Sequence, residues 1–129
     1  MRELFIIRGL PGSGKSTLVE LICGRANTFS ADDFFYDGGD YKYDGAKIKD
    51  AHYDCMKRVS RAMLQLTEMI AICNTFTREW EFTDYENLAN MHGYRIHYII
   101  IENRHKGKSS HGVPLSVIDK MKERFEIKL

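Results

Sequence analysis

This chain of 129 residues has almost no net charge, only three cysteines and no long apolar run. The formal net charge is +1, so the overall charge does not argue for a nucleic-acid partner, and any attraction to phosphates must be local. The three cysteines include no C-x-x-C spacing, which argues against a zinc or redox motif and favours reduced thiols in a cytosolic protein. The sequence begins with a strand pattern and has no long apolar run, so we expect a cytoplasmic protein with no secretion signal and no membrane span.

The length fits one compact domain over residues 1–129, in which short apolar runs alternate with helical patterns. Strands are predicted over residues 4–7, 28–31, 69–73 and 94–101, helices over residues 16–23, 46–66, 77–91 and 114–126, and loops over residues 37–45 and 102–112. This alternation predicts an α/β fold with a parallel sheet of about four strands and helices on both faces. Ligands of such folds bind beyond the carboxyl ends of the strands, so the segments that follow the four strands should surround one crevice.

The segment from Gly9 to Ser16 matches the phosphate-loop (Walker A) pattern G-x-x-x-x-G-K-[ST] in full. Glycines let the backbone wrap around a phosphate chain, and the helix that follows adds its positive N-terminal end. Lys15 supplies a charge for the β- and γ-phosphates of ATP, and the Ser16 hydroxyl is a suitable ligand for Mg²⁺. The alternative is a chance glycine turn, but a predicted strand before the segment and a predicted helix after it argue against that.

The sequence therefore predicts an ATP-binding protein with the three-layer sandwich of the P-loop NTPases. The candidate nucleotide-binding residues are Gly9, Pro11, Gly12, Ser13, Gly14, Lys15, Ser16 and Thr17.

Two acidic residues, Asp32 and Asp33, follow the second predicted strand. A kinase that acts on a hydroxyl needs a carboxylate to accept the proton, and a carboxylate at the end of a strand beside the phosphate loop could reach the γ-phosphate. The alternative is that these residues cap a short helix. We expect a division of roles, in which one aspartate acts in catalysis and the other caps.

The polar segment from Glu102 to Gly112 contains the cationic or potentially cationic residues Arg104, His105, Lys106 and Lys108. One interpretation is a lid whose cations neutralise the transferring phosphoryl group. The other is a solvated loop. Glycines at both Gly107 and Gly112 and the scarcity of apolar anchors suit a segment that closes over a bound nucleotide.

Aromatic residues gather in the middle of the chain, namely Phe34, Phe35, Tyr36, Tyr41, Tyr43, Tyr53 and Trp80. They could stack on a base. The interpretation that we favour is a role in the core and in the wall of the crevice.

Several segments together resemble the phage-type polynucleotide 5′-kinases and related small P-loop kinases, which are AAA-type ATP-binding kinases. The similar segments are the phosphate loop at Gly9–Thr17, the acidic pair within Ser30–Phe34, Asn74-Thr75 at a strand end, and His111–Pro114 before the last helix. The resemblance covers most of the chain. It implies transfer of the γ-phosphoryl group of ATP to the 5′-OH of a nucleic-acid end, with Asp32 as the general base.

The chain departs from that family at several positions, and its stretch before the lid is shortened. The family has an arginine where this chain has Phe35, an aspartate at the position of Cys73 or Asn74, and an asparagine where Phe76 stands. In many P-loop proteins an aspartate at the strand end holds the Mg²⁺ shell, and neither Cys73 nor Asn74 is acidic. A loose alignment places Lys108 at the family's lid arginine.

Our first interpretation is an ATP-dependent kinase of a hydroxyl, with a nucleic-acid 5′ end as the first choice of acceptor. Lys15 and the loop amides would hold phosphates, Ser16 would bind Mg²⁺, Asp32 would take the proton, and Lys108 or Arg104 would stabilise the transition state. Three alternatives stay open: a kinase of a small molecule or modified base, a non-enzymatic nucleotide-binding module whose missing carboxylate and arginine mark lost turnover, and a slow ATPase within a larger assembly.

Overall fold

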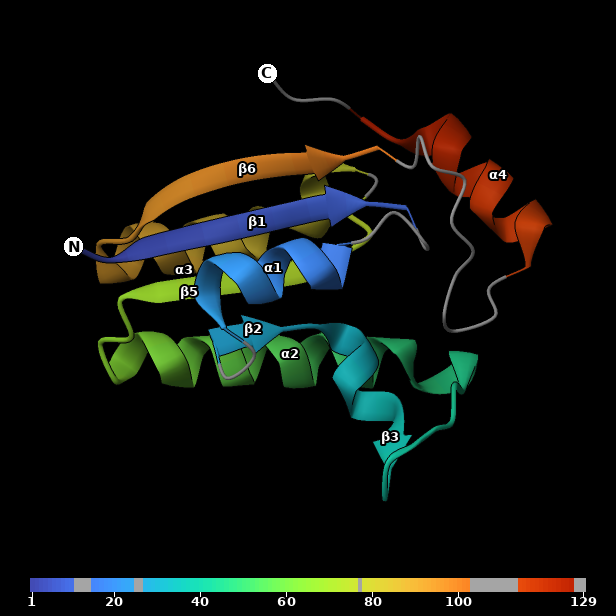
Figure 1. Cartoon of the computed structure of the whole chain (residues 1–129), viewed down its shortest axis with the longest axis horizontal. Coiled ribbons are helices and arrows are strands. Elements are labelled where there is room, and N and C mark those ends of the chain that lie inside the picture. The colour runs from blue at the N-terminus through green and yellow to red at the C-terminus, as the bar shows by residue number, and fades with distance from the viewer. Residues whose placement is uncertain (11–14, 25–26, 77, 103–113, 127–129) are drawn as a thin grey trace.

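The structure is a computed structural model, and it describes residues 1–10, 15–24, 27–76, 78–102 and 114–126 (Figure 1). Four strands form one parallel sheet, in the order β2 (Thr28–Phe29), β5 (Met69–Asn74), β1 (Glu3–Gly9) and β6 (Arg95–Ile101). The helices are α1 (Lys15–Cys23), α2 (Ile48–Leu64), α3 (Thr83–His92) and α4 (Leu115–Arg124). Short 3₁₀ turns cover Ala31–Phe35, Gly45–Lys47 and Glu79–Glu81, and a hairpin is formed by β3 (Tyr36–Asp37) and β4 (Asp40–Tyr41).

The central strand is β1, which runs parallel to β5 on one side and to β6 on the other. The register pairs Arg8 with Asn74 of β5 and Gly9 with Ile101 of β6, so three carboxyl ends lie side by side. The strand arrows in Figure 1 point to this edge of the sheet, and α4 and the β3–β4 hairpin lie toward it. The edge is therefore where a parallel sheet of this type binds its ligands.

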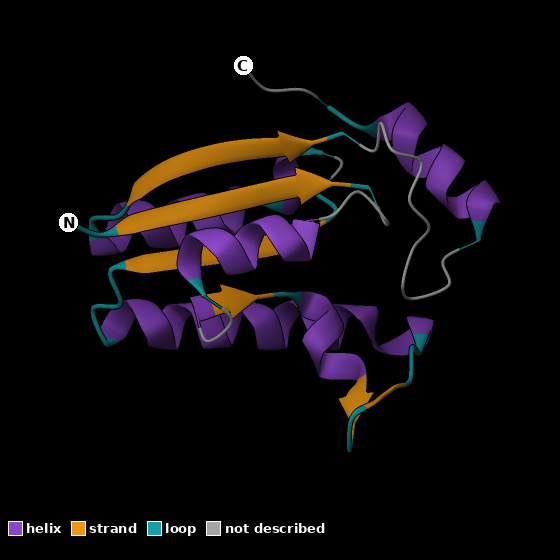
Figure 2. Ribbon diagram, in the orientation of Figure 1, coloured by secondary structure: helices purple, strands orange, loops and turns teal. Residues whose placement is uncertain are grey.

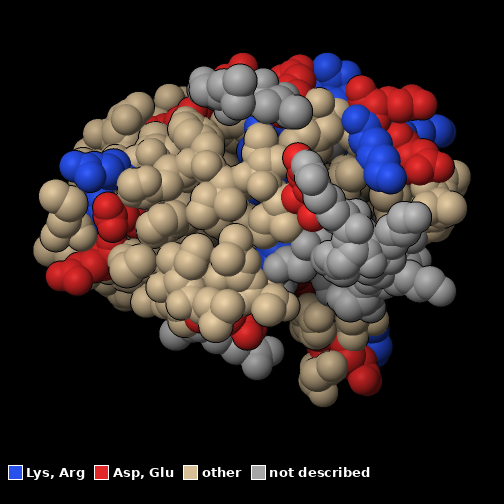
Figure 3. All heavy atoms as spheres, turned by 45° about the horizontal axis from the view of Figure 1, so that its top comes forward, with Lys and Arg blue, Asp and Glu red and all other residues tan. Residues whose placement is uncertain are grey.

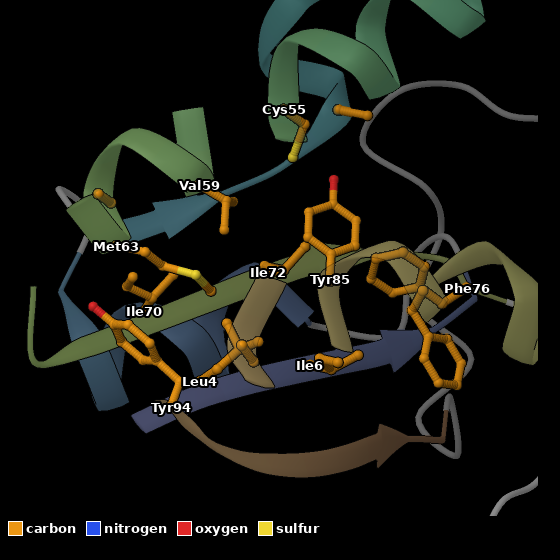
Figure 4. Close-up of a cluster of buried hydrophobic side chains, with 14 of the residues drawn as sticks. Leu4, Ile6, Cys55, Val59, Met63, Ile70, Ile72, Phe76, Tyr85 and Tyr94 are labelled. Carbon is orange, nitrogen blue, oxygen red and sulfur yellow. The ribbon is translucent and has the colours of Figure 1, made fainter. Parts of the chain in front are cut away.

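The larger hydrophobic core lies between the sheet and the helices α2 and α3 (Figure 4). Residues alternate between the two faces of a strand, so Leu4, Ile6, Ile70 and Ile72 all contribute to this core. Cys55, Val59 and Met63 of α2 and Tyr85 of α3 meet them from the helix side. Each fully buried Leu, Ile, Val or Met side chain contributes about 1.5–3 kcal/mol relative to an exposed one, which makes this face the main source of stability.

The opposite face of the sheet is covered by α1. Here Ile7 of β1 and Ala71 and Cys73 of β5 pack against Val19 of α1 in a second, smaller buried cluster. Figure 2 shows helices on both sides of the parallel strands. The predicted α/β fold, with a parallel sheet of four strands and helices on both faces, is confirmed.

Three predicted boundaries were wrong. The second strand ends at Phe29 because Ser30 already caps the following 3₁₀ turn. Residues 37–45, predicted as a loop, contribute to the hairpin, whose strands of two residues are too short to give an alternating pattern. The helix predicted from residue 77 begins at Thr83, because a separate 3₁₀ turn over Glu79–Glu81 comes first. Residue 77 itself lies outside the described residues.

The prediction that the aromatic residues belong to the core holds for Phe35, which is buried, and in part for Tyr41, which is half-buried. The other five are exposed and lie outside the core, and their predicted place in the wall of the crevice stays a prediction: Phe34, Tyr36, Tyr43, Tyr53 and Trp80. Their elements lie at the surface, on the hairpin, on the outer side of α2 and in the turn before α3, so their rings have no layer of structure above them.

Charge is mixed rather than gathered on the face in Figure 3, where acidic and basic side chains adjoin one another around the edge. Cys23, Cys55 and Cys73 are all free thiols, as the sequence predicted. Among the helices of the described ranges, none combines the length and the apolar composition that crossing a membrane requires.

Candidate functional site

The two flanks of the phosphate loop lie at the carboxyl-end edge of the sheet. Gly9 is the last residue of β1, its N–H donates to the Thr75 carbonyl over 3.3 Å, and Lys15 is the first residue of α1. Ser16 and Thr17 continue that helix. No acidic residue stands in the first turn of α1, so no carboxylate of that turn neutralises the positive N-terminal end of the helix.

The Lys15 ammonium folds back onto its own loop. Its Nζ donates to the carbonyl oxygen of Gly9 over 2.7 Å and to that of Leu10 over 3.1 Å. Burial lowers the pKa of this ammonium, while Cys73 and Asp32 act in the opposite direction. A partly desolvated cation that donates to two neutral carbonyls is well matched to an incoming phosphate, because an anion would replace lost hydration more strongly.

The turn Ala31–Phe35 carries the acidic pair and is capped from both directions. The Ser30 side chain accepts from the Asp32 N–H over 3.2 Å, and the Asp33 carboxylate accepts from the Ser30 N–H over 3.2 Å. Asp33 also forms an ion pair with Arg58 of α2 over 3.3 Å. The capping contact therefore belongs to Asp33, which is held by its own turn and by α2.

Asp32 points in a different direction from its neighbour. Its Oδ1 accepts a hydrogen bond from the Tyr41 hydroxyl over 3.2 Å. Its negative charge acts to raise the pKa of Lys15. Asp32 is half-buried, whereas Asp33 is exposed. The two aspartates therefore have different partners: Asp33 is held by its own turn and by Arg58, whereas Asp32 accepts from Tyr41 and its charge acts to raise the pKa of Lys15.

Asn74 at the end of β5 fixes the acidic turn to the sheet. Its Oδ1 accepts from the Ala31 N–H over 2.9 Å and from the Ser30 hydroxyl over 3.3 Å. The residue is 8% exposed, so these hydrogen bonds are shielded from water. The sequence singled out Asn74 as a missing carboxylate. The structure shows a second property, because its amide oxygen positions the turn that carries Asp32.

Sequence reasoning missed Arg8, which is 1% exposed and lies beside Asn74 on β1. Its Nε donates to the Phe76 carbonyl over 2.8 Å, and its Nη2 donates to the Glu126 carbonyl. The guanidinium also lies over the rings of Phe82 and Phe125, 5.0 and 4.6 Å from their centroids. A charged residue within the apolar run before the phosphate loop was the available signal, since such a charge needs buried partners.

Phe76 has a positive φ of 48° and is buried. This backbone conformation is unfavourable for a bulky residue and far easier for asparagine. The ring is nevertheless packed edge-on against both Phe82 and Tyr85. The Phe76 side chain therefore belongs to the core, and its carbonyl serves Arg8.

Part of the predicted site lies outside the described residues, namely Pro11, Gly12, Ser13, Gly14, Arg104 and Lys108. The lid function of the last two and the metal-binding function of Ser16 remain predictions. Across the described ranges, no group of three or more His, Cys, Asp or Glu residues is arranged to hold a metal ion.

Comparison with known proteins adds a family and a fold. The family model described as AAA domain matches residues 4–127 of this chain. Human NEDD4-binding protein 2 is 31% identical over 133 residues, an alignment that covers 95% of this chain. The chain spans only 8% of the length of that curated relative.

Two solved structures resemble the whole sheet and its helices. Chaetomium thermophilum Kti12 in complex with ADP-AlF3 has a TM-score of 0.64 at 16% identity, over 96% of this chain and 80% of that chain. A mutant of the Mycobacterium tuberculosis APS kinase CysC has a TM-score of 0.52 at 14% identity, over 95% of this chain and 93% of that chain. At such identities the likeness shows the fold alone, which is that of a P-loop NTPase.

Proposed function

The chain belongs to the AAA domain family, and from this premise we propose that it binds ATP with Mg²⁺ and transfers the γ-phosphoryl group to a hydroxyl, first of all the 5′-OH of a nucleic-acid end. The kinase-like P-loop fold supplies the general setting. The observation that carries the proposal is the difference within the acidic pair: Asp33 is used by the cap, while Asp32 takes no part in that contact, accepts from Tyr41 and acts electrostatically on Lys15.

The described residues fit a nucleotide polyphosphate. Lys15 is a partly desolvated cation at the start of a helix that has no acidic residue in its first turn. A triphosphate would replace the Gly9 and Leu10 carbonyls as the partner of the ammonium and would also meet the helix N-terminus. Ser16 is the residue that would hold Mg²⁺, which when bound would neutralise charge on the phosphates.

The proposed chemistry assigns one task to each residue of this chain. Lys15 would hold the β- and γ-phosphates, and Asp32 would accept the proton of the attacking hydroxyl. Tyr41 and Asn74 would position Asp32, since one contacts its carboxylate and the other anchors its turn. Arg104 and Lys108 would stabilise charge on the transferring group.

The relatives support this proposal at a general level. One solved structure of the same fold is named a kinase, and the other was solved with ADP-AlF3. They support phosphoryl chemistry on this fold, and the nucleic-acid acceptor rests on the sequence resemblance to polynucleotide 5′-kinases. A small molecule or a modified base is the sister proposal for the acceptor.

A second candidate function is a nucleotide-binding or slow ATPase module without transfer to an acceptor. The observation in its favour is the end of β5, where Cys73 is an unsuitable magnesium ligand and the Asn74 oxygen is already bonded to Ala31 and Ser30. Such a module would keep Lys15 and ATP binding but would not transfer phosphate to an acceptor.

Transfer of labelled phosphate from γ-labelled ATP separates these proposals. The acceptors are an oligonucleotide with a free 5′-OH, the same oligonucleotide already phosphorylated at its 5′ end, and a set of nucleosides and small hydroxyl compounds. We expect label on the first acceptor alone. Label on a small compound would support the sister proposal, and label only in free phosphate would support the ATPase.

A further inference from the structure

The β3–β4 hairpin has regular antiparallel pairing, although each of its strands has only two residues. Its turn is Gly38-Gly39, and both glycines have positive φ angles, 59° and 92°, as a tight two-residue hairpin turn requires. Tyr36 pairs with Tyr41 across the hairpin, and the Lys42 N–H donates to the Phe35 carbonyl over 2.8 Å. A hairpin this short is marginal in isolation, so something else must hold it.

The Phe35 side chain anchors the hairpin to the core. This ring is 5% exposed, belongs to the larger core, and contacts the rings of Tyr41 and Tyr43 at centroid distances of 6.2 and 5.1 Å. Tyr36 in turn lies against Tyr41 at 5.2 Å. The aromatic rings therefore form a continuous series that starts in the core and ends at the surface of the hairpin.

Two rings of this series, Phe35 and Tyr36, line a pocket of about 280 Å³ together with Phe34. Phe34 and Tyr36, which are 38% and 48% exposed, form its walls with Phe35, and Lys42, Lys47, Asp37 and Asp44 surround them. Ligand pockets span roughly 300–1,000 Å³, so this one suits a single ring system rather than a long chain. We refer to it below as the hairpin pocket.

The hairpin pocket adjoins the proposed base. Phe34 follows the acidic pair in the same 3₁₀ turn, and Tyr41 of the hairpin donates to Asp32 over 3.2 Å. The residue that contacts the proposed base and the residues that line the pocket therefore belong to the same turn and hairpin. In Figure 1 the hairpin projects from the carboxyl-end side of the sheet, with its outer surface away from the main core.

The charges of the pocket indicate the kind of group that fits. Two carboxylates, Asp37 and Asp44, stand beside two ammonium groups, Lys42 and Lys47, and Lys42 lies 3.4 Å from Asp37. The two positive and two negative charges cancel, so the pocket offers a phosphate no net attraction. A planar ring with donors and acceptors along its edge suits both signs of charge, and its faces suit the aromatic side chains.

We propose that the hairpin pocket binds the nucleobase at the 5′ end of the acceptor, with its face stacked on Tyr36 and Phe34 and its polar edge toward the lysines and aspartates. This inference rests on the proposed function, because it takes Asp32 as the residue that meets the 5′-OH. It assigns acceptor recognition to the hairpin and leaves ATP to the phosphate loop.

The test measures binding in the absence of ATP, by the anisotropy of an oligonucleotide labelled at its 3′ end. One oligonucleotide has a normal 5′-terminal nucleoside with a free hydroxyl, and its partner has an abasic residue at that position. Stacking of one base is worth about tenfold in affinity, so the wild-type protein should prefer the normal end by about that factor. Tyr36→Ala should remove the preference, and Tyr36→Phe should keep it.

Tyr53→Ala is the matched control, since Tyr53 is exposed on α2 and does not line the pocket. Phe34→Ala is the second test variant if Tyr36→Ala unfolds. Equal affinity of the wild type for the two oligonucleotides, or no binding of either, overturns the inference. A retained preference in both Tyr36→Ala and Phe34→Ala also overturns it. Base-dependent binding without any phosphoryl transfer would instead uphold the pocket and reject the kinase proposal.

Discussion

Arg8 and Asn74 are neighbours across β1 and β5, yet their side chains hold different segments of the chain in different ways. Asn74 is a neutral amide whose side-chain oxygen fixes the acidic turn by accepting two hydrogen bonds. Arg8 is a buried cation that reaches the carbonyls of Phe76 and Glu126 and lies between two aromatic rings. One residue positions the proposed base, and the other joins the strand before the phosphate loop to the last described residues of the chain.

The difference lies in the cost of burial. Burial lowers the pKa of Arg8, and Glu126, Glu81 and Glu79 oppose this effect from nearby. The Glu126 carboxylate also accepts from Arg78 over 2.9 Å and from the Glu79 N–H over 3.0 Å, so a wider network supports this side. Burial of the Asn74 side chain calls for no such network of charged partners, because an amide carries no charge to desolvate. Loss of Arg8 should therefore affect the fold most, and loss of Asn74 should affect the reaction.

The largest expected effect on stability is that of Arg8→Ala. The variant leaves the Phe76 carbonyl without its partner and opens a cavity between Phe82 and Phe125, so the free energy of unfolding should fall by about 2–4 kcal/mol. Urea unfolding followed by circular dichroism measures it. Arg8→Lys keeps the charge but loses the planar group, so its free energy of unfolding should lie between those of the wild type and Arg8→Ala. Unchanged urea midpoints for both variants would contradict a role of Arg8 in stability.

Lys15→Ala tests the cation at the start of α1. A charge-assisted contact to phosphate is worth about 1.5–3 kcal/mol, so ATP affinity should drop by about tenfold or more while the fold survives. Titration calorimetry gives the affinity, and Lys49→Ala on the exposed surface of α2 is the control. Equal affinity of wild type and Lys15→Ala would reject the phosphate-loop assignment.

Asn74→Ala should act on the reaction more than on the nucleotide. The Ala31 N–H would lose its buried acceptor, at a cost of about 1–2 kcal/mol in stability, and the turn with Asp32 would become less ordered. We expect the transfer rate to fall while ATP affinity changes little. Asn74→Asp keeps an acceptor oxygen and should lose less. A wild-type rate in Asn74→Ala would show that the turn needs no anchor on β5.

Tyr41→Phe has the smallest expected effect. It removes the hydroxyl that contacts Asp32 but leaves the ring against Phe35. Such a hydrogen bond is worth about 0.5–1.5 kcal/mol, so transfer should slow by roughly two- to tenfold with no change in ATP affinity. Tyr43→Phe, a tyrosine that packs on the same Phe35 ring, is the control and should behave as wild type. Equal loss in both variants would indicate a general effect on the hairpin.

The sequence predicted the elements whose pattern is long enough to read. β5 and β6 follow their apolar runs, and α3 ends at His92 with Gly93 in the left-handed conformation, as glycine permits. The strand and helix around the phosphate loop were predicted for the same reason. The hairpin was missed because two residues per strand show no period, and its stability comes from Phe35, whose contacts only the folded chain displays.

Of the candidate site, the sequence supplied the residue types but not their partners. It predicted that one aspartate would cap and that the other would act, and the capping contact is now assigned to Asp33. It could not foresee Arg8, because the partners of that cation lie on segments distant in the chain, at Phe76, Phe82 and residues 125–126. Long-range pairing of this kind leaves no local pattern.

The central claim is that Asp32, and not Asp33, accepts the proton of the attacking hydroxyl. The most direct measurement compares Asp32→Asn with Asp33→Asn in labelled phosphoryl transfer at saturating ATP, with ATP affinity determined in parallel. We expect Asp32→Asn to keep ATP affinity and to lose transfer by about 10²-fold or more. Asp33→Asn should lose stability through its cap and its Arg58 contact but retain most transfer. An inactive Asp33→Asn beside an active Asp32→Asn, or full activity in both variants, would contradict the account.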